Sequence, residues 1–304
     1  TTEEVVLDLG GTTTDIAVLV DGVPLLQPLG IRMGGINPLV RGLRTFSLGV
    51  GGDSWVRLEG EELKVGPERK GRALAYGGPE PTPTDALIAL GLAQGGQKRR
   101  AIEGIRRLAE RMGASLEETA EQVVSKTCAL ILETVNALVE RVNQQPVYTI
   151  HELLKGRQIR PSGLIVIGGP AKELAPRLES MSGWQARVPP DYDVANAIGA
   201  AMARTTCEVT VMADTDRRYV IAPEEGYVDT IDWRATKKEV IRIAFDLLRK
   251  KALRLGAREE NLQMELLEEH EFRMVQGFYP VGRNIRVRAQ VKPGLISPYS
   301  EAGA

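Results

Sequence analysis

The chain has 304 residues, enough for two domains, or three small ones, with substantial buried cores. Lysine and arginine number 39 against 40 aspartate and glutamate residues, so the net charge of −1 gives no support for a nucleic-acid partner. No run of residues approaches the ~20 apolar residues of a membrane span, no signal peptide is visible, and two distant cysteines form no disulfide framework. We therefore expect a cytoplasmic protein without a membrane partner.

The first chemical signal is a loop between two apolar runs. Val5–Leu9 and Ile16–Val20 are typical of buried strands, and Asp8 and Asp15 bracket the loop that joins them. The loop consists of Gly10, Gly11, Thr12, Thr13 and Thr14. Glycine lets backbone amides approach an anion closely, the threonine hydroxyls add donors, and Asp8 can hold a cation or orient a water. The hairpin predicts a phosphate-binding loop, with an ordinary tight turn as the alternative.

The following segment reads as short strands and glycine-rich loops. We expect strands at Val23–Leu29, Arg44–Leu48, Ser54–Leu58 and Glu62–Val65, the last two paired, with loops at Gly30–Pro38, Gly49–Ser54 and Gly66–Thr84. The last of these loops is long enough to be either functional or disordered. Paired glycines such as Gly51 and Gly52 suit a ligand that approaches the backbone closely.

Three helices are expected next, at Asp85–Leu92, Gln97–Met112 and Leu116–Val142. Ser115 and Glu118 form a capping-box signature at the start of the third helix. An apolar stripe on that helix includes Cys128, which favours a core role for this cysteine over a catalytic one.

A second glycine-rich turn lies further along the chain. After a short helix at Ile150–Lys155, a buried strand, Gly163–Ile167, ends at Gly168 and Gly169 and leads into a helix at Ala171–Met181. The order strand, glycine turn, helix suits a nucleotide, because a helix N-terminus presents free amides and partial positive charge. A short strand at Ala186–Pro189 and a helix of small residues at Val194–Arg204 follow.

The pattern changes after Thr206. Strands at Glu208–Met212 and Arg218–Ala222, a helix opened by Thr236 and Glu239, and alternating segments ending near Leu266 and Val291 form a ββαββ module. We therefore divide the chain into residues 1–206 and an α+β domain at 207–304. The basic side chains of Arg286, Arg288 and Lys292 could form a binding strip, but a solvated sheet face is the simpler interpretation.

The segment Asp8-Leu-Gly-Gly-Thr-Thr-Thr-Asp15 resembles the phosphate hairpin of the superfamily of actin, sugar kinases and heat-shock chaperones. Within it, the chain resembles the hydantoinase/5-oxoprolinase A family over about residues 4–205. The specific segments are Leu63-Lys-Val-Gly-Pro-Glu68 and Pro81-Thr-Pro-Thr-Asp-Ala-Leu87, supported by Gly49-Val-Gly-Gly-Asp-Ser54.

This resemblance implies an α/β fold: an actin-like ATPase (ribonuclease H-like) lobe with a mixed sheet and flanking helices. Family members hold ATP between two such lobes, and the segments after residue 49 resemble those of the second lobe. The first lobe then belongs to a missing part of the chain or to a partner subunit. An isolated lobe would expose a broad cleft face, which makes homo-oligomerisation plausible.

The resemblance also implies a reaction, in which ATP phosphorylates the carbonyl oxygen of a cyclic amide and water opens the ring. The hairpin amides and hydroxyls and Gly51 and Gly52 would hold the nucleotide, with Gly168 and Gly169 against the adenosine. Asp8 would bind Mg²⁺. Asp8 and Asp85 are the candidate catalytic residues. Their alternatives are a turn-stabilising carboxylate and a helix N-terminal acid. Asp53, Ser54 and Thr84 are further cleft candidates.

The sequence departs from the family in two places. The segment Gly71-Arg-Ala-Leu-Ala-Tyr-Gly77 lacks a cysteine usual in the family, and the turn at Gly168 lacks a nearby histidine. These departures leave open that the chain acts on a different substrate or on none. Besides the hydrolase, we consider a small-molecule kinase, an activator of a radical dehydratase, and a non-catalytic nucleotide-binding or interaction lobe. The long loop after Gly66 argues against the kinase, and the lone cysteines argue against the activator. His151 and His270 have no partner at ligand spacing and are expected at the surface.

Overall fold

The computed structural model describes residues 2–25, 43–144, 158–277 and 279–297. The chain forms two compact units, residues 1–196 and 197–304, whereas the sequence placed the change of domain after residue 206. Three expected elements, the helix at Ile150–Lys155, the loop at Gly30–Pro38 and the end of the strand at Val23–Leu29, lie outside the described residues, as does His151.

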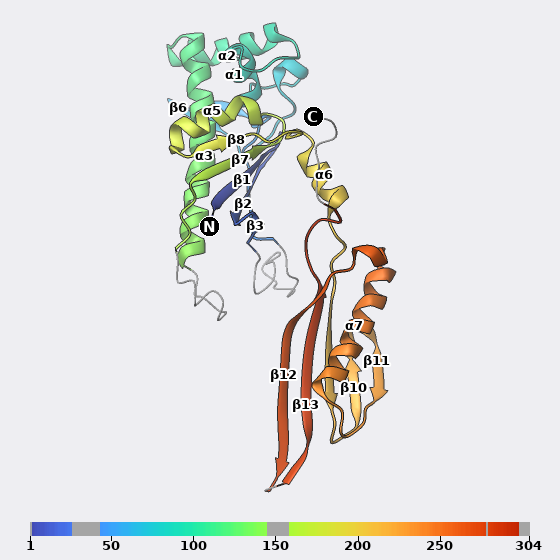
Figure 1. The fold of residues 1–304 in the computed structure, drawn as a ribbon. Coiled ribbons are helices and arrows are strands. Elements are labelled where there is room, and N and C mark those ends of the chain that lie inside the picture. The colour runs from blue at the N-terminus through green and yellow to red at the C-terminus, as the bar shows by residue number, and fades with distance from the viewer. Residues whose placement is uncertain (1, 26–42, 145–157, 278, 298–304) are drawn as a thin grey trace. The chain divides into compact units, whose positions relative to one another are not determined.

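The first unit is built on a mixed sheet (Figure 1). Its strand order is β3-β2-β1-β7-β8, with β4 also pairing β2. The strands are β1 (Glu3–Leu9), β2 (Thr14–Val20), β3 (Val23–Pro24), β4 (Thr45–Leu48), β7 (Gly163–Ile167) and β8 (Gln185–Arg187). The β1–β2 hairpin is antiparallel, and β7 runs parallel to β1 and to β8. The expected α/β lobe with a mixed sheet is therefore confirmed.

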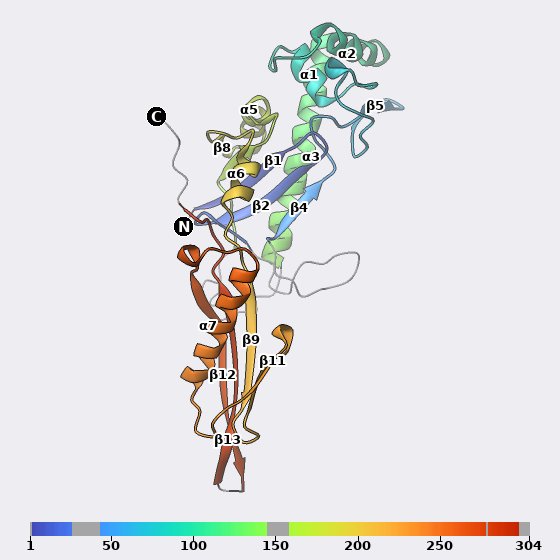
Figure 2. The ribbon, with the colours of Figure 1, turned by 90° about the vertical axis from the view of Figure 1, so that its right-hand side faces the viewer.

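Helices cover this sheet and form a small helical layer of their own (Figure 2). They are α1 (Pro83–Ala89), α2 (Lys98–Met112), α3 (Leu116–Gln144) and α5 (Ala171–Ser182). A further helix, α6 (Ala195–Met202), spans the boundary between the two units. The long helix α3 contacts α1, α2, α5 and the strands β2, β4 and β6. By length and composition alone α3 could cross a membrane, but its apolar stripe is buried in the core of this unit.

Local sequence signals set the ends of these helices. The Glu118 amide donates to the Ser115 hydroxyl, and the Ser115 amide donates to the Glu118 carboxylate, which confirms the capping box of α3. Cys128 is fully buried, and burial raises the pKa of its thiol to about 12, so the predicted core role is confirmed. Helix α1 begins two residues before the expected start, at Pro83, because proline suits the first helical position.

The loop predicted at Gly66–Thr84 has structure of its own. A short 3₁₀ helix, η1 (Leu74–Tyr76), divides it, and it ends at Pro83. Before it, β5 (Val56–Glu59) and β6 (Glu62–Val65) pair with each other as expected and form a separate two-stranded sheet.

The second unit is a five-stranded antiparallel sheet with one helix, α7 (Lys237–Arg254). Its strand order is β11-β10-β9-β13-β12. The elements are β9 (Glu208–Asp214), β10 (Tyr219–Ala222), η2 (Pro223–Glu225), β11 (Tyr227–Thr230), η3 (Glu259–Asn261), β12 (Met264–Gln276) and β13 (Tyr279–Val291). The predicted ββαββ order was wrong by one strand, because β11 adds an edge strand before α7.

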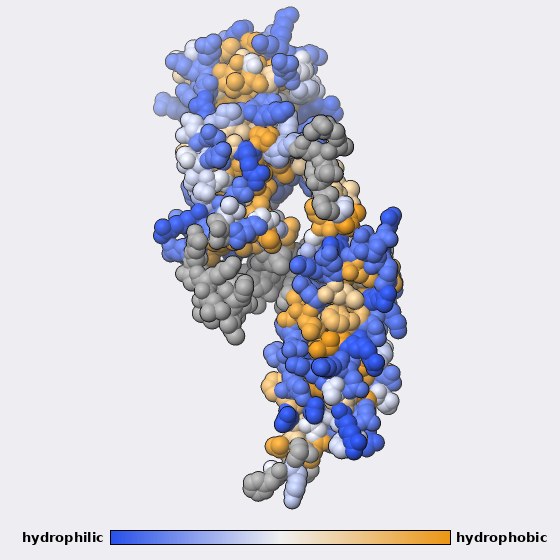
Figure 3. Space-filling model, viewed as in Figure 1, coloured by the Kyte–Doolittle hydropathy of each residue, from blue (hydrophilic) through white to orange (hydrophobic). Residues whose placement is uncertain are grey.

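The last hairpin of this unit is longer than the sequence indicated. Strands β12 and β13 each span 13 residues, and β9 covers only Asn284–Gln290 of β13. The far end of the hairpin therefore projects past the other strands (Figure 1). It carries the exposed side chains of Phe272, Val275 and Tyr279, and apolar colour is visible toward that end in Figure 3.

The proposed basic strip on β13 is not supported by the contacts of its central residue. Arg288 donates to the carboxylates of Glu208 and Glu268, so its charge is neutralised within the sheet. His270 is exposed on β12 and stacks on Phe272 with ring centroids 6.3 Å apart.

Candidate functional site

The tip of the β1–β2 hairpin is closed by one backbone bond. The Gly10 amide donates to the Thr13 carbonyl at 2.9 Å. The amides of Gly11, Thr12 and Thr13 donate to no acceptor among the described residues. Three adjacent amides without an internal partner are a potential anion-binding site, because backbone N–H groups need acceptors and can find them on a phosphate.

The three threonines of the loop are not equivalent. Thr14 is fully buried, and its hydroxyl donates to the Val50 carbonyl at 2.7 Å. Its hydroxyl therefore ties the hairpin to the next loop and is already engaged. Thr12 and Thr13 lie at the accessible tip, where Thr12 is exposed and Thr13 is half-buried.

A second glycine-rich loop packs directly on the hairpin. The amides of Gly52 and Asp53 donate to the carbonyls of Gly10 and Gly11 at 2.9 and 2.7 Å. A Cβ atom at Gly51 would lie 2.5 Å from the Gly10 carbonyl oxygen, so only glycine fits between the two backbones. These contacts engage the carbonyls of the hairpin and leave its amides as the groups available to a ligand.

The turn after β7 reaches the same place. Gly168 has a φ of +93°, and a Cβ atom there would lie 2.3 Å from the Leu9 carbonyl oxygen. Gly169 has open space around its Cα, and the Pro170 ring lies 3.9 Å from the position of a Cβ atom on Gly52. The structure therefore brings together the three glycine-rich turns that the sequence assigned to one nucleotide.

Asp8 is half-buried at the base of the hairpin and stands directly opposite Asp15 in the strand register. Its carboxylate accepts a hydrogen bond from the Asn196 side-chain amide at 3.2 Å. Burial, with a further contribution from the Asp15 carboxylate, raises the pKa of Asp8 above its ordinary value. A bound cation would relieve both effects, since it favours the charged form of the carboxyl group.

The described residues contain no group of three or more acidic, histidine or cysteine side chains that could hold a metal ion by themselves. Asp8 and the neighbouring Asp15 can supply one or two carboxylates. Mg²⁺ fits such a site, because it is usually bound by one or two carboxylates together with water and phosphate oxygens.

Asp85 lies at the N-terminus of α1 and is fully buried. Its carboxylate accepts hydrogen bonds from the amides of Leu74, Ala75 and Thr82, at 2.9 to 3.0 Å, and from the Thr82 hydroxyl at 2.9 Å. Burial raises the pKa of Asp85, and these donated bonds oppose the rise. The geometry favours the role of a helix N-terminal acid that holds the 66–82 loop in place, over the catalytic role.

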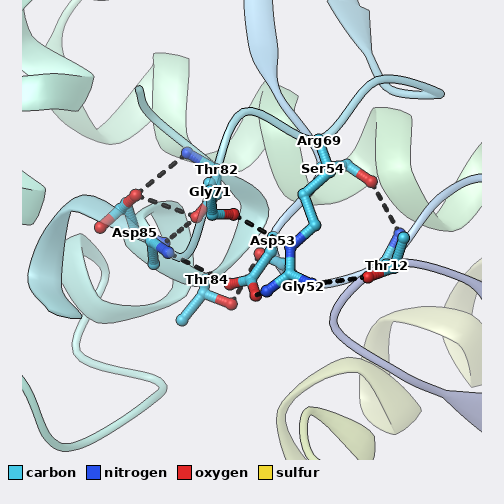
Figure 4. A network of polar contacts seen from close by, with 11 residues as sticks. Thr12, Gly52, Asp53, Ser54, Arg69, Gly71, Thr82, Thr84 and Asp85 are labelled. Carbon is cyan, nitrogen blue, oxygen red and sulfur yellow. Dashed lines mark hydrogen bonds and ion pairs between the residues drawn. The ribbon is translucent and has the colours of Figure 1, made fainter. Parts of the chain in front are cut away.

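Two other cleft candidates also shape the backbone. The Thr84 hydroxyl donates to the Gly52 carbonyl at 2.7 Å, and the Ser54 hydroxyl accepts from the Gly51 amide at 2.8 Å (Figure 4). Both side chains fix the loop that supports the hairpin.

The sequence did not single out Arg69, which joins three parts of the site (Figure 4). Its guanidinium donates to the Thr12 hydroxyl at 2.9 Å, to the Asp53 carboxylate at 2.6 Å and to the Gly71 carbonyl at 3.0 Å. The bond to Thr12 links positions 57 residues apart, so no local spacing reveals it. The only signal was an arginine directly after the Gly-Pro-Glu segment.

The family model for hydantoinase/oxoprolinase matches residues 1–209. The chain belongs to the hydantoinase/oxoprolinase family. No sequence among the curated proteins matches it significantly.

Solved structures extend the likeness in fold. The nucleotide-free structure of acetone carboxylase, reported with the mechanism of ATP-dependent acetone carboxylation, matches with a TM-score of 0.65 at 14% sequence identity. The match covers 95% of this chain and 46% of the acetone carboxylase chain, so this chain spans about half the length of that one. At this identity the match shows the fold, which is the actin-like ATPase fold expected from the sequence.

Two weaker matches involve smaller shares of the chain. EutJ, an ethanolamine utilization protein from Carboxydothermus hydrogenoformans, covers 66% of this chain and 49% of its own, at 15% identity and a TM-score of 0.28. The archaeal actin homologue Ta0583 in complex with ADP covers 65% of this chain and 48% of its own, at 16% identity and a TM-score of 0.30. With TM-scores this low, neither match adds to the argument.

Proposed function

We propose that this chain is the phosphate-holding part of an ATP-dependent hydrolase that opens a cyclic amide of the hydantoin or 5-oxoproline type. The observation that carries the proposal is the hairpin tip of a hydantoinase/oxoprolinase family member. There the amides of Gly11, Thr12 and Thr13 have no acceptor among the described residues, while the loop at residues 49–54 engages the hairpin carbonyls.

The residues around the tip suit a nucleotide with its metal ion. Backbone amides and the Thr12 and Thr13 hydroxyls can bind phosphate oxygens without a charged side chain. Asp8 would hold Mg²⁺. The positive charge of this ion would offset the negative charge of the phosphates and polarise them toward transfer. Gly169, with open space at its Cα, leaves room for the adenosine beside the hairpin.

Family membership supports the cyclic amide as substrate, and the missing cysteine in the segment at residues 71–77 leaves the ring type open. Because this chain spans 46% of the acetone carboxylase chain, we propose that the substrate site is completed by a first lobe, on the same polypeptide or on a partner subunit.

The first test is calorimetric titration of ATP with Mg²⁺ into the chain. Asp8→Asn removes the charge that would hold the metal and keeps the size of the side chain. Glu61→Gln makes the same chemical change at an exposed residue of the β5–β6 turn and serves as the matched control. We expect saturable binding by the wild type and by Glu61→Gln, and weaker Mg²⁺-dependent binding by Asp8→Asn.

Absence of binding by the wild type at millimolar ATP would contradict the proposed phosphate site. If ATP binds, ADP or phosphate release is then measured with hydantoin and with 5-oxoproline, on this chain together with the first lobe that completes the substrate site. Binding with no turnover on either ring by that complex would favour the second candidate function, a non-catalytic nucleotide-binding lobe. The short span of this chain relative to acetone carboxylase is the observation that supports that candidate.

A further inference from the structure

We propose that Arg69 is a phosphate-binding residue, whose guanidinium contacts the phosphate chain held by the hairpin amides. The proposal rests on the proposed function and names a residue beyond the hairpin itself. It starts from the position of this side chain, which crosses from the 66–82 loop to the accessible end of the hairpin (Figure 4).

Arg69 has donors to spare at this position. An arginine carries five N–H groups, and the contacts with Thr12, Asp53 and Gly71 use three of them. The remaining two lie on the terminal nitrogens of the guanidinium, and 42% of the side chain is exposed. These two N–H groups belong to an always-charged plane, and each can donate to a phosphate oxygen.

The charges around the hairpin also favour a basic side chain there. Asp8 and Asp15 stand at the base of the hairpin, and Asp53 lies against it with its side chain only 18% exposed. A bound phosphate would meet these like charges. Among the described residues, Arg69 is the one basic side chain that makes a hydrogen bond to the hairpin loop, and it pairs directly with Asp53. It therefore offsets the charge that would otherwise repel the ligand.

The guanidinium is held in place before any ligand arrives. The Trp55 amide donates to the carbonyl of Glu68, the residue before Arg69, at 2.8 Å. The Asp53 carboxylate that accepts from Arg69 is itself fixed by the Ala73 amide at 3.1 Å. A side chain held in this way loses little conformational entropy when it binds an anion.

The neighbouring Lys70 provides a matched control. Its ammonium pairs with Glu68 at 2.8 Å and lies 4.8 Å from the centre of the Trp55 ring. It has the same charge, a similar exposure and an adjacent position, but no bond to the hairpin.

The alternative is that Arg69 only ties the loops together. The two roles differ in ligand dependence, since a direct contact acts on phosphates alone, whereas a structural tie supports the whole site. The experiment measures binding of ADP, pyrophosphate and adenosine to the wild type, Arg69→Ala, Arg69→Lys and Lys70→Ala, together with the melting temperature of each protein.

We expect Arg69→Ala to weaken binding of ADP and pyrophosphate by about 10- to 100-fold, the usual effect of losing charge-assisted hydrogen bonds. Adenosine binding should be unchanged, Arg69→Lys should recover part of the loss, and Lys70→Ala should match the wild type. The salt dependence of pyrophosphate binding should also decrease in Arg69→Ala, because this variant has one positive side chain fewer to attract the pyrophosphate.

Three results would overturn the inference. The first is equal loss of adenosine and pyrophosphate with a lower melting temperature, which would identify a structural tie. The second is unchanged pyrophosphate affinity, and the third is tighter binding, which would mean that Arg69 blocks the hairpin. If the wild type binds none of the three ligands, the proposed function fails as well, so the two failures are distinguishable.

Discussion

Replacement of Asp85 tests whether this carboxylate supports the fold or the chemistry. The perturbation is Asp85→Ala, compared with Glu118→Ala. Both acids belong to a capping box at a helix N-terminus and accept a bond from the N-cap residue. They differ in burial, because Asp85 is fully buried and Glu118 is exposed. Asp85 also accepts bonds from the amides of Leu74 and Ala75, so the comparison separates a buried carboxylate that holds a loop from an exposed one that only caps its helix.

The expected magnitude follows from the bonds that are lost. Asp85→Ala leaves three backbone amides and one hydroxyl without their acceptor in a dry environment. An unsatisfied buried donor costs about 1–3 kcal/mol, and relaxation of the loop makes the sum less than additive. We expect a loss of about 3–5 kcal/mol from the free energy of unfolding. Glu118→Ala should lose about 0.5–1 kcal/mol, because water replaces the carboxylate.

Asp85→Asn refines the test. One carboxylate oxygen accepts three of the four bonds, and the other accepts only the Ala75 amide. An asparagine can keep its oxygen at the first position and turn its own N–H₂ toward Ala75. The cost should therefore fall between the wild type and alanine, at about 2 kcal/mol.

The assay is urea unfolding followed by tryptophan fluorescence. Trp55 and Trp184 report on the first unit, and Trp233, the only other tryptophan of the chain, is replaced by phenylalanine in every variant. The reasoning would be refuted if Asp85→Ala stayed within 1 kcal/mol of the wild type. A variant of normal stability that had lost turnover would instead support the catalytic role.

Three further outcomes are expected. Gly51→Ala should cost about 1–3 kcal/mol and weaken ATP binding, because its Cβ meets hairpin carbonyls, while Gly169→Ala, with open space, should be tolerated in urea midpoints. The stabilising effect of protonated Asp8 is complete below pH 3.8, its ordinary pKa, and is lost as the pH rises through its raised folded-state pKa. Asp8→Asn should therefore remove this decline from a pH series of urea midpoints. Cys128 should resist iodoacetamide at pH 8 in the folded protein, while half-buried Cys207 reacts slowly, as measured by peptide mass spectrometry.

The elements that the sequence predicted are those with a local signal. Strands β1 and β7 are continuous apolar runs. The capping box of α3 consists of Ser115 and Glu118, which are three residues apart. Strand β11 was missed because it is four residues long and three of its side chains are exposed, so it shows no alternation. The outer part of β12 was missed for a related reason, since it carries glutamates and the exposed apolar residues Phe272 and Val275, and none of its described side chains is buried.

The residues of the candidate site also divide into those with a local signal in the sequence and those brought together only by the fold. The glycine-rich turns could be predicted, because glycine pairs at the ends of strands can be recognised in the sequence itself. Which hydroxyls remain available could not be predicted, since Thr14 and Thr84 are engaged by the carbonyls of Val50 and Gly52, at positions 36 and 32 residues away. Arg69 was missed because its partner Thr12 becomes a neighbour only when the 66–82 loop folds over the hairpin.

Backbone packing alone explains why glycine is needed at two positions of the site, without any ligand. Gly51 and Gly168 are required because backbone packs on backbone, at Gly10 in one case and at Leu9 in the other. This packing engages the carbonyls of the hairpin, and the free amides are its consequence. The glycine motif therefore marks where three turns meet, and it is shared by every protein built in this way. What distinguishes one phosphate site from another must come from side chains at its edge. In the phosphate site that we propose for this chain those are Asp8 and Arg69, one suited to a cation and the other to an anion.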